Sequence, residues 1–191
     1  AIAREVSPLL SEFSNDILLN EAHFNREKAA IENTNHDSLT PEQEMLLKQS
    51  YKGFVRNGAL LGENEKQQLR EIDVNLSKLS LEFGEHVLAE TNRYELILEN
   101  EADLDGLPAH AKVLAAETAR EKGYEGKWVI TLDYPSYIPF MTYATNRDLR
   151  KQLSIAFASK AFKGDELDNQ QIVKDIVRLR NERAKLLGYD T

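Results

Sequence analysis

Four histidines are the side chains of this sequence best suited to bind a metal or move a proton: His23, His36, His86 and His110. Helical zinc hydrolases need two His four residues apart with a Glu after the first, because this spacing places both imidazoles on one helix face. Here each His stands alone, and His86 is followed by Val-Leu-Ala-Glu. We therefore expect these His to be solvated or structural, with a metal site assembled across the fold as the open alternative.

Two pairs of acidic residues could in principle act as a general acid and a general base: Asp103 with Asp105, and Asp165 with Asp168. Both pairs lie in segments typical of turns and helix caps, where a short carboxylate accepts hydrogen bonds from backbone N–H groups. We expect this local role for both pairs. The sequence also has no nucleophile elbow, phosphate loop or dinucleotide fingerprint, and without Cys it has no thiol nucleophile.

Two further clusters have a structural and a functional interpretation. Four cations gather near the end of a predicted helix, which favours internal ion pairs or a solvated face over an anion site. Aromatic residues three apart beside two prolines favour a packed corner over a wall for stacking a ligand. These sets are Arg178, Arg180, Arg183 and Lys185, and Tyr134, Tyr137, Phe140 and Tyr143. We predict no catalytic, cofactor-binding or metal-binding residue in this chain.

Composition excludes several classes of protein. The 191 residues carry 24 basic and 32 acidic side chains, a net charge of −8 that argues against a general nucleic-acid binder. The absence of Cys excludes a disulfide scaffold, and no apolar run reaches the roughly 18–20 residues of a membrane span. The first residues show no signal peptide and no initiator Met. We expect a single helical domain over 1–191, cut from a longer protein.

Most of the elements that position these side chains are predicted helices. Thr40-Pro41-Glu42-Gln43 has the form of a capping box, and its helix should end at Asn57-Gly58. A long helix follows from about 63 to 92. Three shorter ones are expected over about 108–122, 145–157 with Thr145 as its cap, and 168–187, and an earlier one between 16 and 32.

The long helix carries two apolar stripes on different sides. The main stripe has spacings of three and four, and the second repeats every seven residues: Leu69, Ile72, Leu76, Leu79 and Phe83, and Val74, Leu81 and Leu88. Two stripes require two partners, so the second faces either a segment that this chain lacks or other helices of the chain itself. We expect the first case to expose an apolar patch around Val74, Leu81 and Leu88.

Two short segments break the helical period and predict a small β element at about 94–98 and 128–132. The helix between them favours parallel pairing. We expect Trp128, the single tryptophan, to be largely buried beside Leu96 or Leu98. The predicted fold class is therefore mainly α, a helical lobe of long packed helices with one two-stranded β element.

Six segments in order carry a resemblance to a known family. They are Phe54–Leu61, Leu79–Gly84, Leu104–Pro108, Trp128–Tyr137, Asn146–Arg150 and Leu179–Tyr189. In this order and spacing, the chain resembles the N-terminal half of the thimet-oligopeptidase family of zinc metallopeptidases, with the bacterial peptidyl-dipeptidase (dipeptidyl carboxypeptidase) branch looking closest.

The resemblance implies a larger, two-lobed enzyme that cleaves short peptides in an enclosed channel. The family's H-E-x-x-H helix and its further Glu ligand would lie beyond this chain, so no catalytic residue is carried over and zinc belongs to the parent enzyme. The partners implied are the remaining C-terminal catalytic part and short peptide substrates, with no nucleic acid and no membrane. We expect a cytoplasmic parent, or a periplasmic one after signal-peptide removal. The alternative is a self-sufficient helical interaction module.

Overall fold

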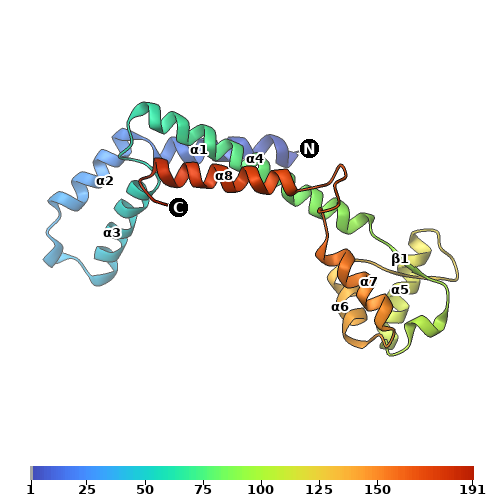
Figure 1. Cartoon of the computed structure of the whole chain (residues 1–191). Helices are drawn as coiled ribbons and strands as arrows, with labels where there is room; N and C mark the ends of the chain where they lie inside the picture. The colour runs from blue at the N-terminus through green and yellow to red at the C-terminus, as the bar shows by residue number, and fades with distance from the viewer. Residues whose placement is uncertain (1) are drawn as a thin grey trace. The chain divides into compact units, whose positions relative to one another are not determined.

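The computed structural model describes residues 2–191 and is mainly helical, as the sequence predicts. The chain forms two compact units (Figure 1), one made of the described residues up to Glu82 with Ile172–Thr191, the other of Phe83–Gln171. The boundary falls inside the long helix. The expectation of a single domain over 1–191 stays a prediction.

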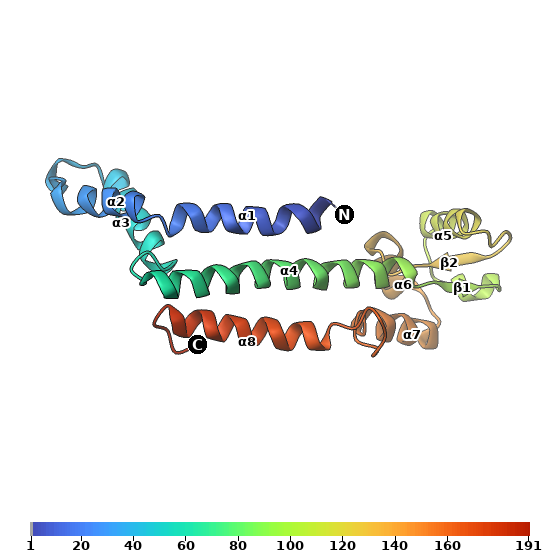
Figure 2. The same ribbon diagram turned by 90° about the horizontal axis from the view of Figure 1, so that it is seen from above.

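The first unit is helical throughout. In both views its helices α1, α4 and α8 run side by side, and α2 and α3 form an antiparallel hairpin (Figures 1 and 2). Its elements are α1 (Ile2–Leu18), α2 (Glu21–Asn33), the 3-10 turn η1 (His36–Ser38), α3 (Pro41–Arg56), the first part of α4 (Glu63–Arg93) and most of α8 (Gln170–Leu186).

The predicted capping box of α3 is confirmed. The Thr40 hydroxyl accepts from the Gln43 N–H at 3.3 Å, and the Gln43 side chain accepts from the Thr40 N–H at 3.0 Å. The helix ends at Asn57-Gly58, where Gly58 has a φ of +93° that only glycine adopts at little cost. The start of α3 therefore follows from four adjacent residues.

The helix expected between 16 and 32 is present as α2, whereas α1 before it was not expected. The two helices are separated by a break at Leu19-Asn20. The break is stabilised by Asn20, whose side chain accepts the His23 N–H at 2.8 Å and thereby caps α2. Pro8 lies inside α1, beyond its first turn, and lacks the N–H that would donate to the Arg4 carbonyl.

The second unit packs helices around a two-stranded sheet. Its elements are the end of α4, β1 (Leu96–Leu98), the 3-10 turn η2 (Glu101–Leu104), α5 (Ala109–Glu121), β2 (Trp128–Ile130), α6 (Tyr134–Tyr143) and α7 (Arg147–Ala158). The fully buried side chains of this unit include Leu104, Leu132, Phe140 and Leu153, which form its apolar core.

The expected parallel pairing of the strands is wrong. β1 and β2 are antiparallel, with Leu98 opposite Trp128 and Leu96 opposite Ile130. The segment 99–127 therefore leaves and re-enters at the same end of the sheet, because η2 and the turn after it redirect the chain before α5 begins. A crossover helix imposes parallel strands only where it carries the chain to the opposite end of the sheet.

Trp128 lies beside Leu98 as predicted, but it is only half-buried. Val129 and Ile130 are both buried, although they point to opposite faces of the strand. Helix α5 packs against β2. Both faces of β2 are therefore covered at Val129 and Ile130, whereas Ile97 of β1, opposite Val129, is exposed.

Candidate functional site

The four histidines lie apart and have different surroundings. The His23 ring meets the Phe54 ring edge-on at 4.9 Å, and His36 Nε2 lies 3.0 Å from the Ile31 carbonyl oxygen. His86 Nδ1 lies 2.9 Å from Asn169 Oδ1, and His110 is exposed at the start of α5. Within residues 2–191, no three His, Asp or Glu side chains gather closely enough to hold a metal ion.

Asp165 and Asp168 stabilise the turn before α8, which is the local role expected of them. Asp168 accepts the N–H groups of Gly164 at 2.6 Å and Gln170 at 2.8 Å, and these bonds hold its pKa below the usual range. Asp165 accepts the Leu167 N–H at 3.2 Å and pairs with Arg93 at 2.5 Å. The hydrogen bond from Arg93 lowers the pKa of Asp165. Both carboxyls are thus held ionised by structural partners.

Asp103 and Asp105 connect η2 to the start of α7 through side-chain hydrogen bonds. Asp103 accepts the Asn146 amide at 3.1 Å, and Asp105 accepts the Thr145 hydroxyl at 2.9 Å. Thr145, which we expected to be the N-cap of this helix, therefore donates its hydroxyl to Asp105 instead. The N-cap of α7 is Asn146, whose Oδ1 accepts the N–H of Asp148 at 3.1 Å and of Leu149 at 3.2 Å.

Two of the four cations of α8 form ion pairs and the other two lie on an exposed face, the two roles that the sequence favours. Arg178 lies 3.3 Å from Asp175 and 3.0 Å from Glu182, one helical turn away on either side. Arg183 pairs with Asp73 of α4 at 2.7 Å. Arg180 and Lys185 are exposed. The patch serves mainly to stabilise its own helix and to attach it to α4.

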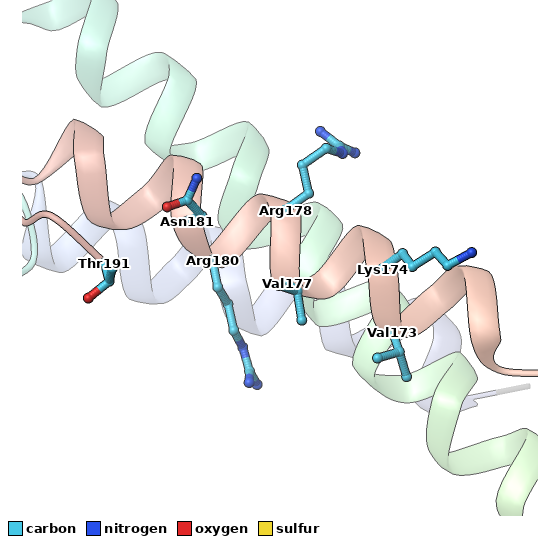
Figure 3. A pocket seen from close by; sticks show the side chains of 7 residues that line it. All are labelled: Val173, Lys174, Val177, Arg178, Arg180, Asn181 and Thr191. Carbon is cyan, nitrogen blue, oxygen red and sulfur yellow. The ribbon is translucent and has the colours of Figure 1, made fainter.

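The outer face of α8 carries a shallow groove with a volume of about 690 Å³ (Figure 3). Val173, Val177 and Arg180 point to one side of the helix, while Lys174 and Arg178 point to another. The groove is also lined by Asn181 and Thr191. All seven side chains are exposed, as expected of an open groove on the surface of a helix.

The aromatic segment forms the packed corner that the sequence favours. It folds into α6, where Tyr137 stacks on Phe157 of α7 with ring centroids 4.2 Å apart. Tyr134 contacts the same ring at 6.1 Å, and Phe140 is fully buried in the core. These rings hold α6 on α7, while Tyr134 and Tyr143 remain largely exposed.

A cluster of charged side chains surrounds Glu90, and the sequence patterns did not predict it. The Glu90 carboxylate is almost fully buried at the end of α4 and accepts hydrogen bonds from Arg93, at 2.5 Å, and Lys163. Arg93 also pairs with Glu166 at 2.8 Å. Nearby, the buried Asn169 amide donates to the Phe83 carbonyl at 3.1 Å. These contacts attach the segment before α8 to α4, 73 residues away in sequence, which no local pattern could indicate.

Comparison with known proteins shows which proteins this chain is similar to. Residues 140–191 match the model of peptidase family M3. The chain is 37% identical over 195 residues to a probable cytosolic oligopeptidase A of Arabidopsis thaliana, a match that covers 99% of this chain. Over its whole length, the chain resembles the peptidases of family M3.

Two bacterial relatives agree with this placement. Oligopeptidase A of Haemophilus influenzae is 36% identical over 188 residues, covering 96% of this chain and 28% of its own length. Dipeptidyl carboxypeptidase of Escherichia coli is 32% identical over 185 residues, with 97% and 27% covered. The identities lie too close together to assign a branch, so a closer kinship with the dipeptidyl carboxypeptidases stays a prediction.

The chain spans little more than a quarter of the length of the curated relatives that it matches, 28% for the Arabidopsis protein. The M3-like segment described here therefore corresponds to a helical portion of much longer proteins. No helix among residues 2–191 is long and apolar enough to cross a membrane.

Proposed function

We propose that this chain is part of a larger zinc-dependent peptidase that hydrolyses short peptides, and that it contributes to a non-catalytic helical lobe. The observation that carries the proposal is the similarity of the whole chain to oligopeptidases and dipeptidyl carboxypeptidases several times its length. Each of the six segments in register is a piece of helix, strand or turn in the structure, with side chains used for packing and capping.

Zinc is the metal that the family implies, and it fits no group of residues described here. A zinc site takes three or four His, Cys or carboxylate ligands, and residues 2–191 bring no such group together. We therefore derive no catalytic step within this chain. In the parent enzyme, zinc would act in another part of the polypeptide as a Lewis acid and as the activator of a water molecule.

The self-sufficient interaction module receives less support. Such a module would use α4 as a coiled-coil-like surface for binding a partner helix. However, α4 belongs to both compact units, and few of its apolar residues are exposed. The relatives named above are peptidases, and none is described by its name as a binding module.

A peptidase assay tests the proposal. The full-length gene product and the chain 1–191 are each incubated with a blocked chromogenic tripeptide, with and without a chelator. We expect turnover from the full-length protein that the chelator abolishes, and none from the chain above a buffer blank. Turnover by the chain alone, or a full-length protein that cleaves no short peptide, would contradict the proposal.

A further inference from the structure

Helix α1 is packed with its polar face inward and its apolar face outward. Six of its seven large apolar side chains recur at spacings of four, three, one, three and four, which places them on one stripe about 100° wide. All six are exposed, including Leu10 at 62% and Phe13 at 63%: Ile2, Val6, Leu9, Leu10, Phe13 and Ile17. We call these six residues the α1 stripe.

The opposite face of α1 makes the contacts with the first unit. Most of its residues are small or polar, with Ser7, Pro8 and Ser11 half-buried and Asn15 buried at 5% exposure, and at its end Leu18 packs against Phe24 and Phe54. At one edge, Asp16 of α1 pairs with Arg70 of α4 at 2.6 Å. The buried and half-buried residues of α1 therefore lie on this side of the helix, and the α1 stripe has no cover among the described residues.

Six exposed apolar side chains on one helix face are a mark of an interface, since removing apolar surface from water is favourable. The second stripe of α4 does not form the patch expected around it, because Val74 and Leu81 are half-buried and only Leu88 is strongly exposed. The exposed apolar surface lies on α1 instead.

We propose that the α1 stripe is the docking surface for a helix in the part of the parent polypeptide that lies outside residues 1–191. This inference rests on the proposed function. It is supported by the length of the relatives, because this chain spans 28% of the Arabidopsis oligopeptidase and most of the related polypeptide lies outside it.

Charge narrows the choice of occupant. Glu5, Glu12 and Asp16 border one side of the α1 stripe, whereas Arg4 is the single cation of the helix. Helices that lie on membranes carry Lys and Arg beside their apolar face, so a lipid surface does not fit. A second copy would bring the same acidic borders of a chain of charge −8 together. The occupant we infer is an apolar helix face bordered by Lys or Arg.

Single cysteines report whether the surface is covered, because the natural segment contains no Cys. Phe13→Cys and Leu10→Cys place a thiol on the α1 stripe, and Ser14→Cys, exposed on another side of the same helix, is the matched control. Each variant is made in the chain 1–191 and in the full-length gene product. Maleimide labelling is timed at the new cysteine by peptide mass spectrometry, and circular dichroism checks that each variant is folded.

We expect all three cysteines to react quickly in the chain at low concentration. In the full-length protein, Phe13→Cys and Leu10→Cys should react at least about tenfold more slowly than Ser14→Cys. Equal rates at all three positions in the full-length protein would overturn the proposal. Protection that grows with protein concentration would overturn it in favour of a second copy. A peptidase assay on the same full-length protein separates the two proposals, since labelling and turnover can fail independently.

Discussion

Asp73 of α4 and Arg183 of α8 form an ion pair across 2.7 Å, although they are 110 residues apart in sequence. The same guanidinium donates at 3.4 Å to Oδ1 of Asn57, the residue that ends α3. One arginine therefore joins three helices of the first unit.

Replacing Arg183 by Met should destabilise the first unit. The side chains of Arg183 and Asp73 are 29% and 17% exposed, so their interaction is only partly screened by water. We expect a loss of about 1–2 kcal/mol in the free energy of unfolding, measured by urea titration. Arg180→Met on the exposed side of the same helix is the control and should change stability by less than about 0.5 kcal/mol. Equal losses would show that the Asp73 contact contributes nothing.

Removal of the buried carboxylate of Glu90 should weaken the attachment of the segment before α8 to α4. Its side chain is 2% exposed, whereas its partners Lys163 and Arg93 are partly exposed and can be hydrated once it is gone. We therefore expect Glu90→Ala to cost about 1–3 kcal/mol. Glu166→Ala removes a 74% exposed carboxylate from the same Arg93 and should cost less than about 0.5 kcal/mol. If both variants lose the same stability in denaturant unfolding, burial of Glu90 is not the source of the effect.

The second unit should lose stability in acid partly through Glu95. Hydrogen bonds from Lys122 at 2.7 Å and Tyr124 at 2.9 Å lower the pKa of Glu95 from its ordinary value of 4.5. A carboxyl whose pKa is lowered by folding stabilises the protein above its unfolded pKa, and this contribution disappears as the pH falls through the folded pKa.

Urea unfolding at two pH values measures this contribution. Glu95→Gln should be less stable than the natural protein at neutral pH, and the difference should shrink steadily as the pH falls below 4.5. Glu121→Gln, at the exposed end of α5, serves as the control. A Glu95→Gln deficit that is the same in strong acid as at neutral pH would contradict the electrostatic explanation.

Two glycines with the same backbone conformation should differ in their tolerance of alanine. Gly106 has φ of +83° and Gly123 has φ of +84°, so both substitutions carry the left-handed cost of about 1–2 kcal/mol. A Cβ at Gly106 would also lie 2.1 Å from the Tyr143 carbonyl oxygen, whereas at Gly123 it meets nothing within 4 Å. Gly106→Ala should therefore cost about 1–3 kcal/mol more than Gly123→Ala, measured by thermal unfolding. Equal melting temperatures would mean that the approach of Gly106 to Tyr143 is not tight.

Features set by neighbouring residues could be predicted from the sequence. The capping box of α3 and the glycine after it depend on contacts within one turn of helix, as does the end of α8 at Gly188. The local roles of Asp165 and Asp168 follow from the same short-range preference of Asp for nearby N–H groups.

Features set by distant residues could not be predicted. The antiparallel strand pair depends on where the segment 99–127 re-enters the sheet, and the Glu90 cluster depends on a lysine 73 residues away. The apolar period of α1 is present in the sequence, but no neighbouring residue indicates that the stripe faces outward. A stripe shows that a helix has an apolar face, and only the tertiary structure shows what covers it.

Zinc content most directly tests the claim that this chain is a helical part of a zinc peptidase whose metal site lies elsewhere in the polypeptide. The chain 1–191 and the full-length gene product are dialysed against micromolar zinc and then against metal-free buffer, and bound zinc is measured by atomic absorption. We expect one tightly held zinc per full-length molecule and none per chain, because residues 2–191 bring no ligand group together. One tightly held zinc per isolated chain, or a full-length protein without zinc, would contradict it.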